Sequence, residues 1–324
     1  MRTLLPVPRA GVVGSTLPTI FRRYYVSGMT QALDRTNARW INETEQRLAE
    51  WLRVRGSVLV GFSGGVDSAY LACAAVDVLG APNVLAVIGR SASYPDAQWA
   101  TARSVARQFG VPILEIETSE LADPRYAANP TNRCYFCKSE LWSRLSPLAV
   151  ERGLACVVDG TNADDLGDYR PGAQAAREQG IRSPLAELGF TKADIRALSR
   201  ARGIPTWRQP SAPCLSSRIP YGTAVTSERL RQIERAEAAL RSLGVAGDLR
   251  VRFHGDLARI ELPPNDVAGW LVPDAAAKVR AAVIAAGFRR VAIDLRGFRS
   301  GSLNVLGGVV LDAPAGEASE APAA

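Results

Sequence analysis

Residues that usually bind transition metals or build disulfide frameworks are scarce in this chain. Its 324 residues include one histidine and five cysteines. A four-ligand zinc site would therefore need cysteine for most of its ligands. Five is an odd number, and the spacing of the cysteines is not that of a secreted disulfide framework. A reducing cytosol, where thiols persist as ligands or nucleophiles, fits better, so we expect a cytoplasmic protein.

Long apolar runs are also missing. No run approaches the roughly 18 residues needed to span a bilayer, so we expect no transmembrane helix and no membrane partner. The composition, 47% hydrophobic and 22% charged, is typical of an ordinary soluble globular protein. The length allows a sizeable core in one large or two modest domains.

Acidic residues are absent from the first 33 positions, which hold four arginines, whereas the last twelve positions hold two glutamates and no base. The net charge of +7 therefore leaves +5 on the residues between, a mild excess that suits an enzyme of polyanionic small molecules as well as a nucleic-acid binder. The N-terminal composition resembles that of a transit peptide. We favour a flexible leader over residues 1–40, with Met29 as an alternative start, and a disordered tail over 313–324.

Strand-like and helix-like segments alternate from residue 43 onward. Short apolar runs, separated by helical patterns of ten or more residues, lie at 56–62, 83–89, 111–117 and 155–161. This alternation predicts βαβ units, and hence a parallel sheet covered by helices on both faces, over residues 41–210. After residue 210 the order becomes helix, hairpin, helix and strand, which predicts a smaller α+β domain over 211–312.

The sharpest motif is SGGVDS at residues 63–68, which follows the first apolar run and precedes a helix. Two glycines allow a tight turn that presents backbone N–H groups to an anion, and the serine hydroxyls and the helix dipole add to this attraction. Asp67 makes sense there as a Mg²⁺ partner, because a carboxylate alone would repel phosphate. The spacing is neither that of a Walker loop nor GxGxxG. We expect a phosphate-binding loop formed by Ser63, Gly64, Gly65, Asp67 and Ser68.

A second polar segment, DGTNADD at 159–165, follows the fourth apolar run. Open α/β sheets bind ligands at the carboxyl ends of their strands, where this segment would lie. Two interpretations stay open for its polar residues: simple turn chemistry, or a role towards Mg²⁺ or substrate. The residues concerned are Asp159, Asn162, Asp164 and Asp165.

Three of the five cysteines lie outside apolar runs. Cys73 and Cys156 lie inside such runs, so we expect them to be small core residues. The others are Cys134 and Cys137 in NRCYFCKSELW and Cys214 in SAPCLSSRIPYG. They could hold a [4Fe-4S] cluster with one open iron, bind zinc together with the one histidine, or remain uncoordinated or redox-active thiols. Their spacing alone leaves these three interpretations open.

Two arginines of the second half have the spacing of an anion site. Arg250 and Arg252 alternate along a strand and so share one face, as two phosphate-binding side chains should. Arg218 follows Cys214 by four residues and could bind a phosphate or a carboxylate. The one histidine, His254, lies in the HGD turn, where we expect a structural hydrogen bond rather than catalysis.

Seven segments, in order along the chain, resemble one family. The SGGVDS loop is similar to that of the PP-loop (N-type) ATP pyrophosphatases, which cleave ATP between its α and β phosphates. Over roughly residues 40–305 the chain resembles the LarE family, ATP-dependent sulfurtransferases of pyridinium-3,5-biscarboxylic acid mononucleotide in nickel-pincer nucleotide cofactor biosynthesis. The segments that carry this resemblance are SGGVDS, NRCYFCKSELW, DGTNADDLGDYRPG, RSPLAELGFTKADIRALSR, SAPCLSSRIPYG, VRFHGDLARIEL and DLRGFRSGSLN.

The resemblance implies an α/β fold with a PP-loop (adenine nucleotide alpha hydrolase-like) domain, and the use of ATP and Mg²⁺. The enzyme would adenylate a carboxylate and convert it to a thiocarboxylate. The loop residues would hold the departing pyrophosphate, with Asp67 as a catalytic residue. The second strand would lie beside adenine at Ala86, Val87 and Ile88. The small nucleotide substrate would be bound by Arg218, Arg250 and Arg252.

The resemblance also implies a sulfur source. One branch of the family sacrifices a single cysteine, which becomes dehydroalanine, and Cys214 matches that position. Another branch holds a [4Fe-4S] cluster on three cysteines, matched here by Cys134, Cys137 and Cys214. The three-cysteine pattern therefore favours the cluster branch, with Cys214 as a catalytic residue. Glu261 matches an acidic family position and is a candidate metal ligand, and the family implies a homohexamer.

Other protein classes could use the same motifs. A PP-loop tRNA thiolase also combines SGGxDS with three cluster cysteines, but the modest charge and the absence of a separate RNA-binding module or zinc-finger pair argue against nucleic acid as a partner. An amide-forming ligase of this loop class has no need of three thiols. A non-enzymatic iron–sulfur or zinc sensor would leave the phosphate loop unexplained.

Overall fold

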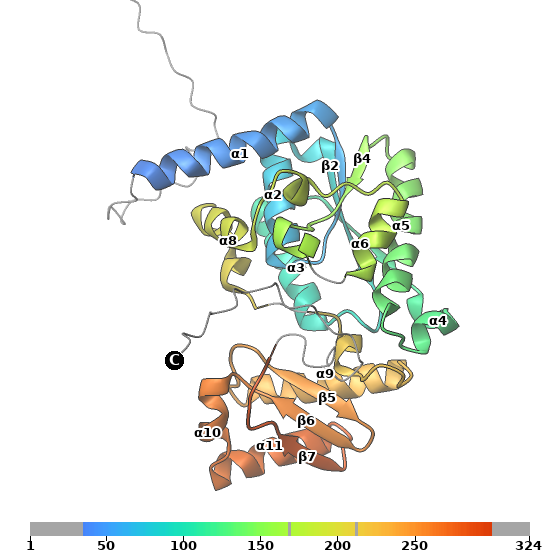
Figure 1. Cartoon of the computed structure of the whole chain (residues 1–324), viewed down its shortest axis with the longest axis vertical. Coiled ribbons are helices and arrows are strands. Elements are labelled where there is room, and N and C mark those ends of the chain that lie inside the picture. Colours follow the sequence, from blue (N-terminus) through green and yellow to red (C-terminus); the bar gives the residue numbers. More distant parts are fainter. Residues whose placement is uncertain (1–34, 168–169, 211–212, 300–324) are drawn as a thin grey trace, which may run out of the picture.

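The computed structural model describes residues 35–167, 170–210 and 213–299. Residues 1–34 of the predicted leader and the predicted tail lie outside the described residues. The described chain contains two sheets, which lie one above the other in Figure 1, each with its own helices.

The first sheet consists of four parallel strands in the order β3-β2-β1-β4. Its strands are β1 (Val58–Gly61), β2 (Val84–Arg90), β3 (Ile113–Glu117) and β4 (Cys156–Val158). Each strand lies within, or one residue beyond, one of the four apolar runs. The predicted α/β fold with a parallel sheet is therefore confirmed.

Helices cover both faces of this sheet. They are α1 (Arg35–Arg55), α2 (Val66–Leu79), α3 (Asp96–Phe109), α5 (Arg133–Glu151), α6 (Pro171–Glu178) and α8 (Lys192–Ala201), with the single turns α4 (Pro124–Ala127) and α7 (Pro184–Glu187). One face packs against α1, α2, α3 and α8, and the other against α5 and α6 (Figure 1). Val58 and Val60 point into the first layer and Leu59 into the second, as the two-residue period of a strand requires.

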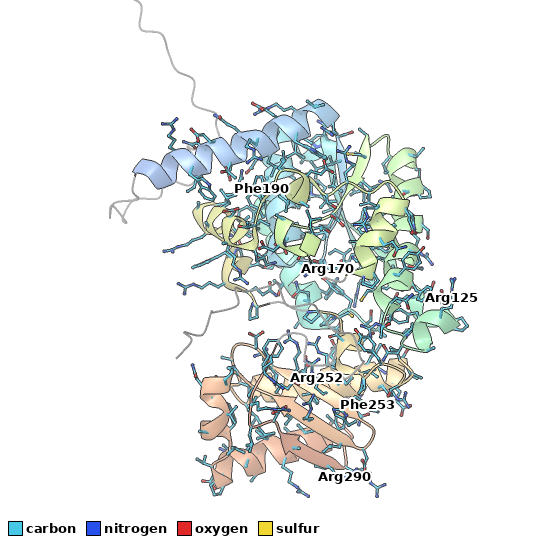
Figure 2. All side chains as sticks on the ribbon, viewed as in Figure 1. Arg125, Arg170, Phe190, Arg252, Phe253 and Arg290 are labelled. Carbon is cyan, nitrogen blue, oxygen red and sulfur yellow. The ribbon has the colours of Figure 1, made fainter. Side chains whose placement is uncertain are left out.

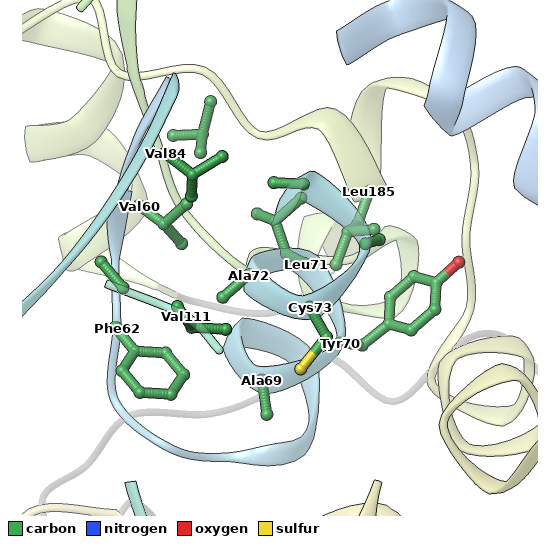
Figure 3. Close-up of a cluster of buried hydrophobic side chains, with 14 of the residues drawn as sticks. Val60, Phe62, Ala69, Tyr70, Leu71, Ala72, Cys73, Val84, Val111 and Leu185 are labelled. Carbon is green, nitrogen blue, oxygen red and sulfur yellow. The ribbon is translucent and has the colours of Figure 1, made fainter. Parts of the chain in front are cut away.

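The central helix α2 is buried along most of its length, and Figure 3 shows its side chains packed towards Val60 and Phe62. Cys73 lies in this cluster and is 2% exposed, so the prediction that it is a core residue is confirmed. Burial raises the pKa of its thiol to about 12, which makes it an inert packing residue. The same prediction for Cys156 is only partly right, because this residue of the short edge strand β4 is half-buried.

The second sheet combines an antiparallel hairpin with a parallel strand. It consists of β5 (Arg250–His254), β6 (Leu257–Glu261) and β7 (Arg290–Ile293), covered by α9 (Ser227–Ser242), α11 (Pro273–Ala285) and the short α10 (Val267–Trp270). The predicted hairpin at the HGD turn is confirmed. The core of this sheet also takes in Tyr126 of α4 and Leu215, so residues before position 210 take part in it. The division at 210 and 211 stays a prediction.

Helix α1 begins at Arg35, eight residues before the start of the pattern that predicted it. The last residues assigned to the leader, 35–40, are therefore helical. Among the helices of the described residues, none combines the length and the apolar character that crossing a bilayer requires.

Candidate active site

The SGGVDS loop joins β1 to α2 and is closed by its own serines. The Ser63 N–H donates to Ser68 Oγ over 3.2 Å, and the two hydroxyl oxygens lie 3.1 Å apart. The loop is pressed against α3: a Cβ on Gly64, whose φ is +67°, would lie 2.5 Å from the Cβ of Ala102. Only glycine meets both conditions at this position.

The loop presents donors at the positive end of a long helix. Gly65 is the N-cap of α2 and offers no side chain to cap the helix, while its own N–H donates to Ser63 Oγ over 3.4 Å. Such a helix start is suited to an anion. The Ser63 carbonyl accepts hydrogen bonds of 3.0 Å from the Tyr94 hydroxyl, just before α3, and from Gln98 Nε2 in the first turn of α3. The loop is therefore rigidly supported by α3, as a phosphate-binding loop needs to be.

A lysine reaches the loop from elsewhere in the chain. Lys192 is the first residue of α8, and its ammonium contacts Asp67 Oδ2 directly. The sequence analysis did not identify Lys192 as a site residue. Its one available signal was its position in the family-like segment RSPLAELGFTKADIRALSR. A loop without its own lysine thus acquires one through the tertiary structure.

The acidic segment after β4 divides between two functions. Asp159 accepts from Thr161 and Ser183, and Asn162 and Asp164 make local or helix-start contacts, so these three residues carry turn chemistry. Asp165 also accepts from the Asn162 N–H over 3.1 Å and pairs with Arg170 at 2.7 Å. It differs in that the charge of Asp67 also acts on its carboxyl. Burial, with a smaller contribution from Asp67, raises the pKa of the Asp165 carboxyl.

These two carboxyl groups fit a hard cation. Asp67 Oδ1 is buried without a hydrogen-bond partner, and the Asp67 charge contributes to the raised pKa of Asp165. Oxygen donors of this kind suit Mg²⁺, which usually takes only one or two carboxylates and completes its shell with water and phosphate oxygens. Within the described residues, no group of three or more His, Cys, Asp or Glu side chains is arranged to hold a metal ion by itself.

The segment predicted to lie beside adenine is buried. Ala86, Val87 and Ile88 are at most 1% exposed, and their strand pairs with β1 on one side and β3 on the other. Neighbouring elements cover their side chains, and their position beside adenine stays a prediction. If adenine lies beside β2, it meets the strand where it ends, near Arg90.

The fold ties the segment of the third cysteine to the helix that carries the other two. Cys134 and Cys137 lie in the first turns of α5, and Cys214 precedes a short 3₁₀ turn, η6 (Leu215–Arg218). Arg133, directly before Cys134, donates to the Ser216 carbonyl, two residues past Cys214, over 3.0 Å, and so ties the two segments together. Within the described residues, however, the three thiols are not arranged as a group that could hold a metal ion. Burial is the main cause that raises the pKa values of Cys134 and Cys137, although Cys134 has surface exposed to solvent.

The cysteine cluster and the phosphate loop share one end of the sheet. The Leu215 N–H, next to Cys214, donates to the Ser93 carbonyl over 2.8 Å, and Ser93 belongs to the loop that leaves the carboxyl end of β2. The SGGVDS loop leaves the carboxyl end of the neighbouring strand β1. The thiols therefore lie at the ligand-binding edge expected of an open α/β sheet.

The predicted substrate arginines surround the segment that carries Cys214. Arg218 donates to both oxygens of Glu237, over 2.9 and 3.0 Å, and to the Cys214 carbonyl over 3.1 Å. Arg252 of β5, labelled in Figure 2, donates to the Ser217 carbonyl over 2.9 Å. Burial, followed by the nearby charges of Arg218 and Arg252, lowers the pKa of Arg250 to about 10. The three predicted arginines thus form one buried cationic cluster.

Glu261, the candidate metal ligand, is held by arginines. It is 1% exposed, and its carboxylate accepts from Arg252 over 2.9 and 2.7 Å and pairs with Arg259 at 3.1 Å. A metal would have to compete with both guanidinium groups for this side chain.

His254 does not approach the thiols. The charged groups that shift its pKa are Arg259, Arg252 and Glu261, while burial is the main cause that lowers it. A zinc site with His254 as fourth ligand therefore finds no support. Its Nε2 is buried without a hydrogen-bond partner, so this nitrogen does not make the predicted structural hydrogen bond.

Comparison with known proteins finds a matching family model and several relatives. The model of the NAD synthase family matches residues 41–143. An uncharacterized protein of Synechocystis is 46% identical over 246 residues, which are 76% of this chain and 91% of that protein. The pyridinium-3,5-bisthiocarboxylic acid mononucleotide synthase of Lactiplantibacillus plantarum is 41% identical over 247 residues, 76% of this chain and 88% of that protein. An uncharacterized protein of Methanocaldococcus jannaschii is 28% identical over 207 residues, 63% of this chain and 77% of that protein.

Proposed function

Because the chain belongs to the LarE family of ATP-dependent sulfurtransferases, we propose that it adenylates a carboxylate of pyridinium-3,5-biscarboxylic acid mononucleotide and converts it to a thiocarboxylate. The observation that carries the proposal is the position of Cys214. Its segment is hydrogen-bonded to the loop after β2 and, through Arg133, to the helix that carries Cys134 and Cys137. A sulfur site beside a phosphate loop is what activation followed by sulfur transfer requires.

The first step activates the carboxylate. A carboxylate oxygen of the substrate attacks the α phosphorus of ATP, and pyrophosphate leaves with the electron pair of the broken P–O bond. The N–H groups at the start of α2 and the hydroxyls of Ser63 and Ser68 would turn from their contacts within the loop to the departing pyrophosphate. Asp67 and Asp165 would hold Mg²⁺, and Lys192, released from Asp67, would contact the phosphates.

The second step replaces AMP by sulfur. An acyl adenylate has a good leaving group, so a sulfur nucleophile can add to its carbonyl carbon and expel AMP. The three thiols fit a [4Fe-4S] cluster in number and chemistry, because cluster irons take cysteine ligands and three of these leave one iron open. When bound, such a cluster would supply an iron site able to carry a transferable sulfide. In the alternative route, Cys214 gives up its own sulfur.

The cationic cluster would bind the anionic substrate. Arg218 and Arg252 contact the backbone on either side of the short turn after Cys214, and Arg250 lies close to both. A phosphate or carboxylate bound there would lie beside the sulfur donor. Guanidinium groups suit this role because their N–H groups match the oxygens of both anions.

The experiment is anaerobic purification, followed by absorption and iron analysis and by intact mass measurement after turnover with ATP and substrate. Iron on the purified protein and an unchanged mass are the expected results. A loss equal to H₂S at Cys214 would instead assign the sulfur to that cysteine. Zinc in place of iron would exclude the cluster, and failure to release pyrophosphate with the substrate would refute the adenylation step. The predicted cytoplasmic homohexamer is tested separately, by fractionation and by light scattering.

A further inference from the structure

Arg133 is a buried cation at the sulfur site. It is the first residue of α5, directly before Cys134, and is 4% exposed. Its Nη1 donates to Asn129 Oδ1 over 2.6 Å and to the Ser216 carbonyl, two residues past Cys214, over 3.0 Å. The guanidinium therefore bridges the CxxC helix and the segment that carries Cys214.

The charge of Arg133 has no carboxylate to balance it. Among the described residues it forms no ion pair with Asp or Glu, and both of its hydrogen-bond acceptors are neutral. The sulfur-bearing residues on the two segments that it bridges are Cys134, the next residue in the chain, and Cys214, two residues before Ser216. Because burying an unbalanced charge costs free energy, a buried arginine of this kind indicates an anion close by. The sulfur atoms are the groups placed to carry it.

Asn129 fixes the same two segments together. It is fully buried and has a φ of +58°, a left-handed backbone conformation that asparagine adopts more readily than most residues other than glycine. Its Nδ2 donates to the carbonyls of Ile219, Pro220 and Thr223 over 3.2, 2.8 and 3.0 Å. Since its Oδ1 also holds Arg133, one amide side chain orients the guanidinium and anchors the chain that follows Cys214.

We propose that Arg133 is the positioning residue of the sulfur site: it holds Cys214 beside Cys134 and balances the negative charge of the sulfur that is transferred. This inference rests on the proposed function. Arg133 does not contact the phosphate loop in this arrangement, so it should affect sulfur transfer without affecting adenylation. Its guanidinium acts on the charge of the sulfur, whether that sulfur belongs to Cys214 or to a cluster.

The test compares wild type with Arg133→Met and Arg133→Lys. A matched control is Arg144→Met, which removes an arginine from the same helix where it is partly exposed and paired with Glu140. Three quantities are measured on protein purified without oxygen: ATP–pyrophosphate exchange with the substrate, the single-turnover rate of sulfur transfer, and the midpoint potential of any bound cluster. Circular dichroism establishes that each variant is folded.

Arg133→Met should exchange pyrophosphate like wild type but transfer sulfur at least about tenfold more slowly, because the anionic sulfur loses its buried counter-charge. Arg133→Lys should recover most of the rate. If a cluster is bound, its midpoint potential should be lower in Arg133→Met than in wild type, because the reduced cluster is more negative and loses more from the missing positive charge. A tenfold change in this one-electron equilibrium corresponds to about 59 mV. If no cluster is bound, the rate of sulfur transfer is the measurement that tests the role of Arg133.

Different outcomes would overturn the proposed function and the proposed role of Arg133. If wild type shows neither pyrophosphate exchange nor sulfur transfer, the proposed function fails. If wild type is active while folded Arg133→Met matches it in transfer rate and potential, the role of Arg133 fails. Equal losses of exchange and transfer in Arg133→Met would also overturn it, since they would indicate a general structural effect.

Discussion

The side-chain ammonium of Lys192 lies against the carboxylate of Asp67, although the two residues are 125 positions apart in the sequence. This ion pair connects the start of α8 to the phosphate loop. A cation and a potential Mg²⁺ ligand thus meet where the phosphates of ATP would bind. In this ion pair the positive charge of Lys192 and the negative charge of Asp67 neutralise each other.

Removing the cation should abolish most of the adenylation activity. We expect Lys192→Met to slow ATP–pyrophosphate exchange by about a hundredfold, the usual effect of losing one donor to a charge that develops in the transition state. Lys278→Met, on the exposed surface of α11, is the control and should behave like wild type. Unchanged exchange in folded Lys192→Met would contradict a role for this lysine at the phosphates.

Gly64 should tolerate no side chain. In Gly64→Ala a left-handed alanine costs about 1 kcal/mol, and its Cβ would lie 2.5 Å from that of Ala102, which forces the loop to move. We expect a lower melting temperature and loss of exchange activity. Gly153→Ala separates the two causes, because Gly153 also has a positive φ, +64°, but nothing lies within 4 Å of the added Cβ. This control should lose a little stability and keep its activity.

Glu237 should matter for stability as well as for the site. Its carboxylate accepts both hydrogen bonds from the buried Arg218 guanidinium, and one oxygen also accepts from the Val251 N–H over 3.0 Å. Glu237→Gln removes the negative charge that balances Arg218, so the free energy of unfolding should fall by about 3 kcal/mol. Denaturant titration measures this change, with exposed Glu228→Gln on the same helix as control. Equal midpoints for the two variants would contradict the pairing.

Magnesium binding should weaken at low pH because of Asp165. Burial raises the pKa of its carboxyl above the ordinary 3.8, and only the ionised form is a good Mg²⁺ ligand. As the pH falls through the raised pKa, protonation removes that ligand. As the pH is lowered, the Mg²⁺ concentration for half-maximal exchange should therefore begin to rise at a higher pH than it would with an aspartate of ordinary pKa.

The variant Asp165→Asn separates this group from others that titrate. It should need more Mg²⁺ than wild type above the raised pKa, match wild type below it, and lose most of the pH dependence. Asp164→Asn is a suitable neighbour control, because Asp164 accepts from the Lys192 N–H at the start of α8. A pH profile that is the same in wild type and Asp165→Asn would exclude Asp165 as the titrating ligand.

Local patterns predicted much of this molecule correctly. The four apolar runs became β1 to β4, and the SGGVDS loop lies between a buried strand and a buried helix, as its neighbours in the sequence required. Periodicity also predicted the hairpin of β5 and β6, with Arg250 and Arg252 both buried. Such features depend on residues a few positions apart, whose backbone preferences and alternation of apolar side chains can be read directly.

Pairings between distant residues could not be predicted in the same way. DGTNADD contains four polar candidates, and only the fold separates Asp165, whose pKa burial and Asp67 raise, from Asp159, which accepts from Thr161 and Ser183. The local sequence around Lys192 and Glu237 gave no indication of the residues that they contact. The same holds for Asn129, whose amide donates to carbonyls some 90 residues away in the chain.

The sequence by itself determined the parallel sheet, the phosphate loop and the family, because strand and helix preferences, glycine geometry and motif order are all local or linear properties. The tertiary structure decided which charged groups meet. It brought Lys192 to Asp67, and it tied the segment of Cys214 to the helix that carries Cys134 and Cys137 through the buried Arg133. The physical reason is that burial and electrostatic pairing depend on distance in space, and chain closure over 80 to 125 residues sets that distance only when the whole core has packed.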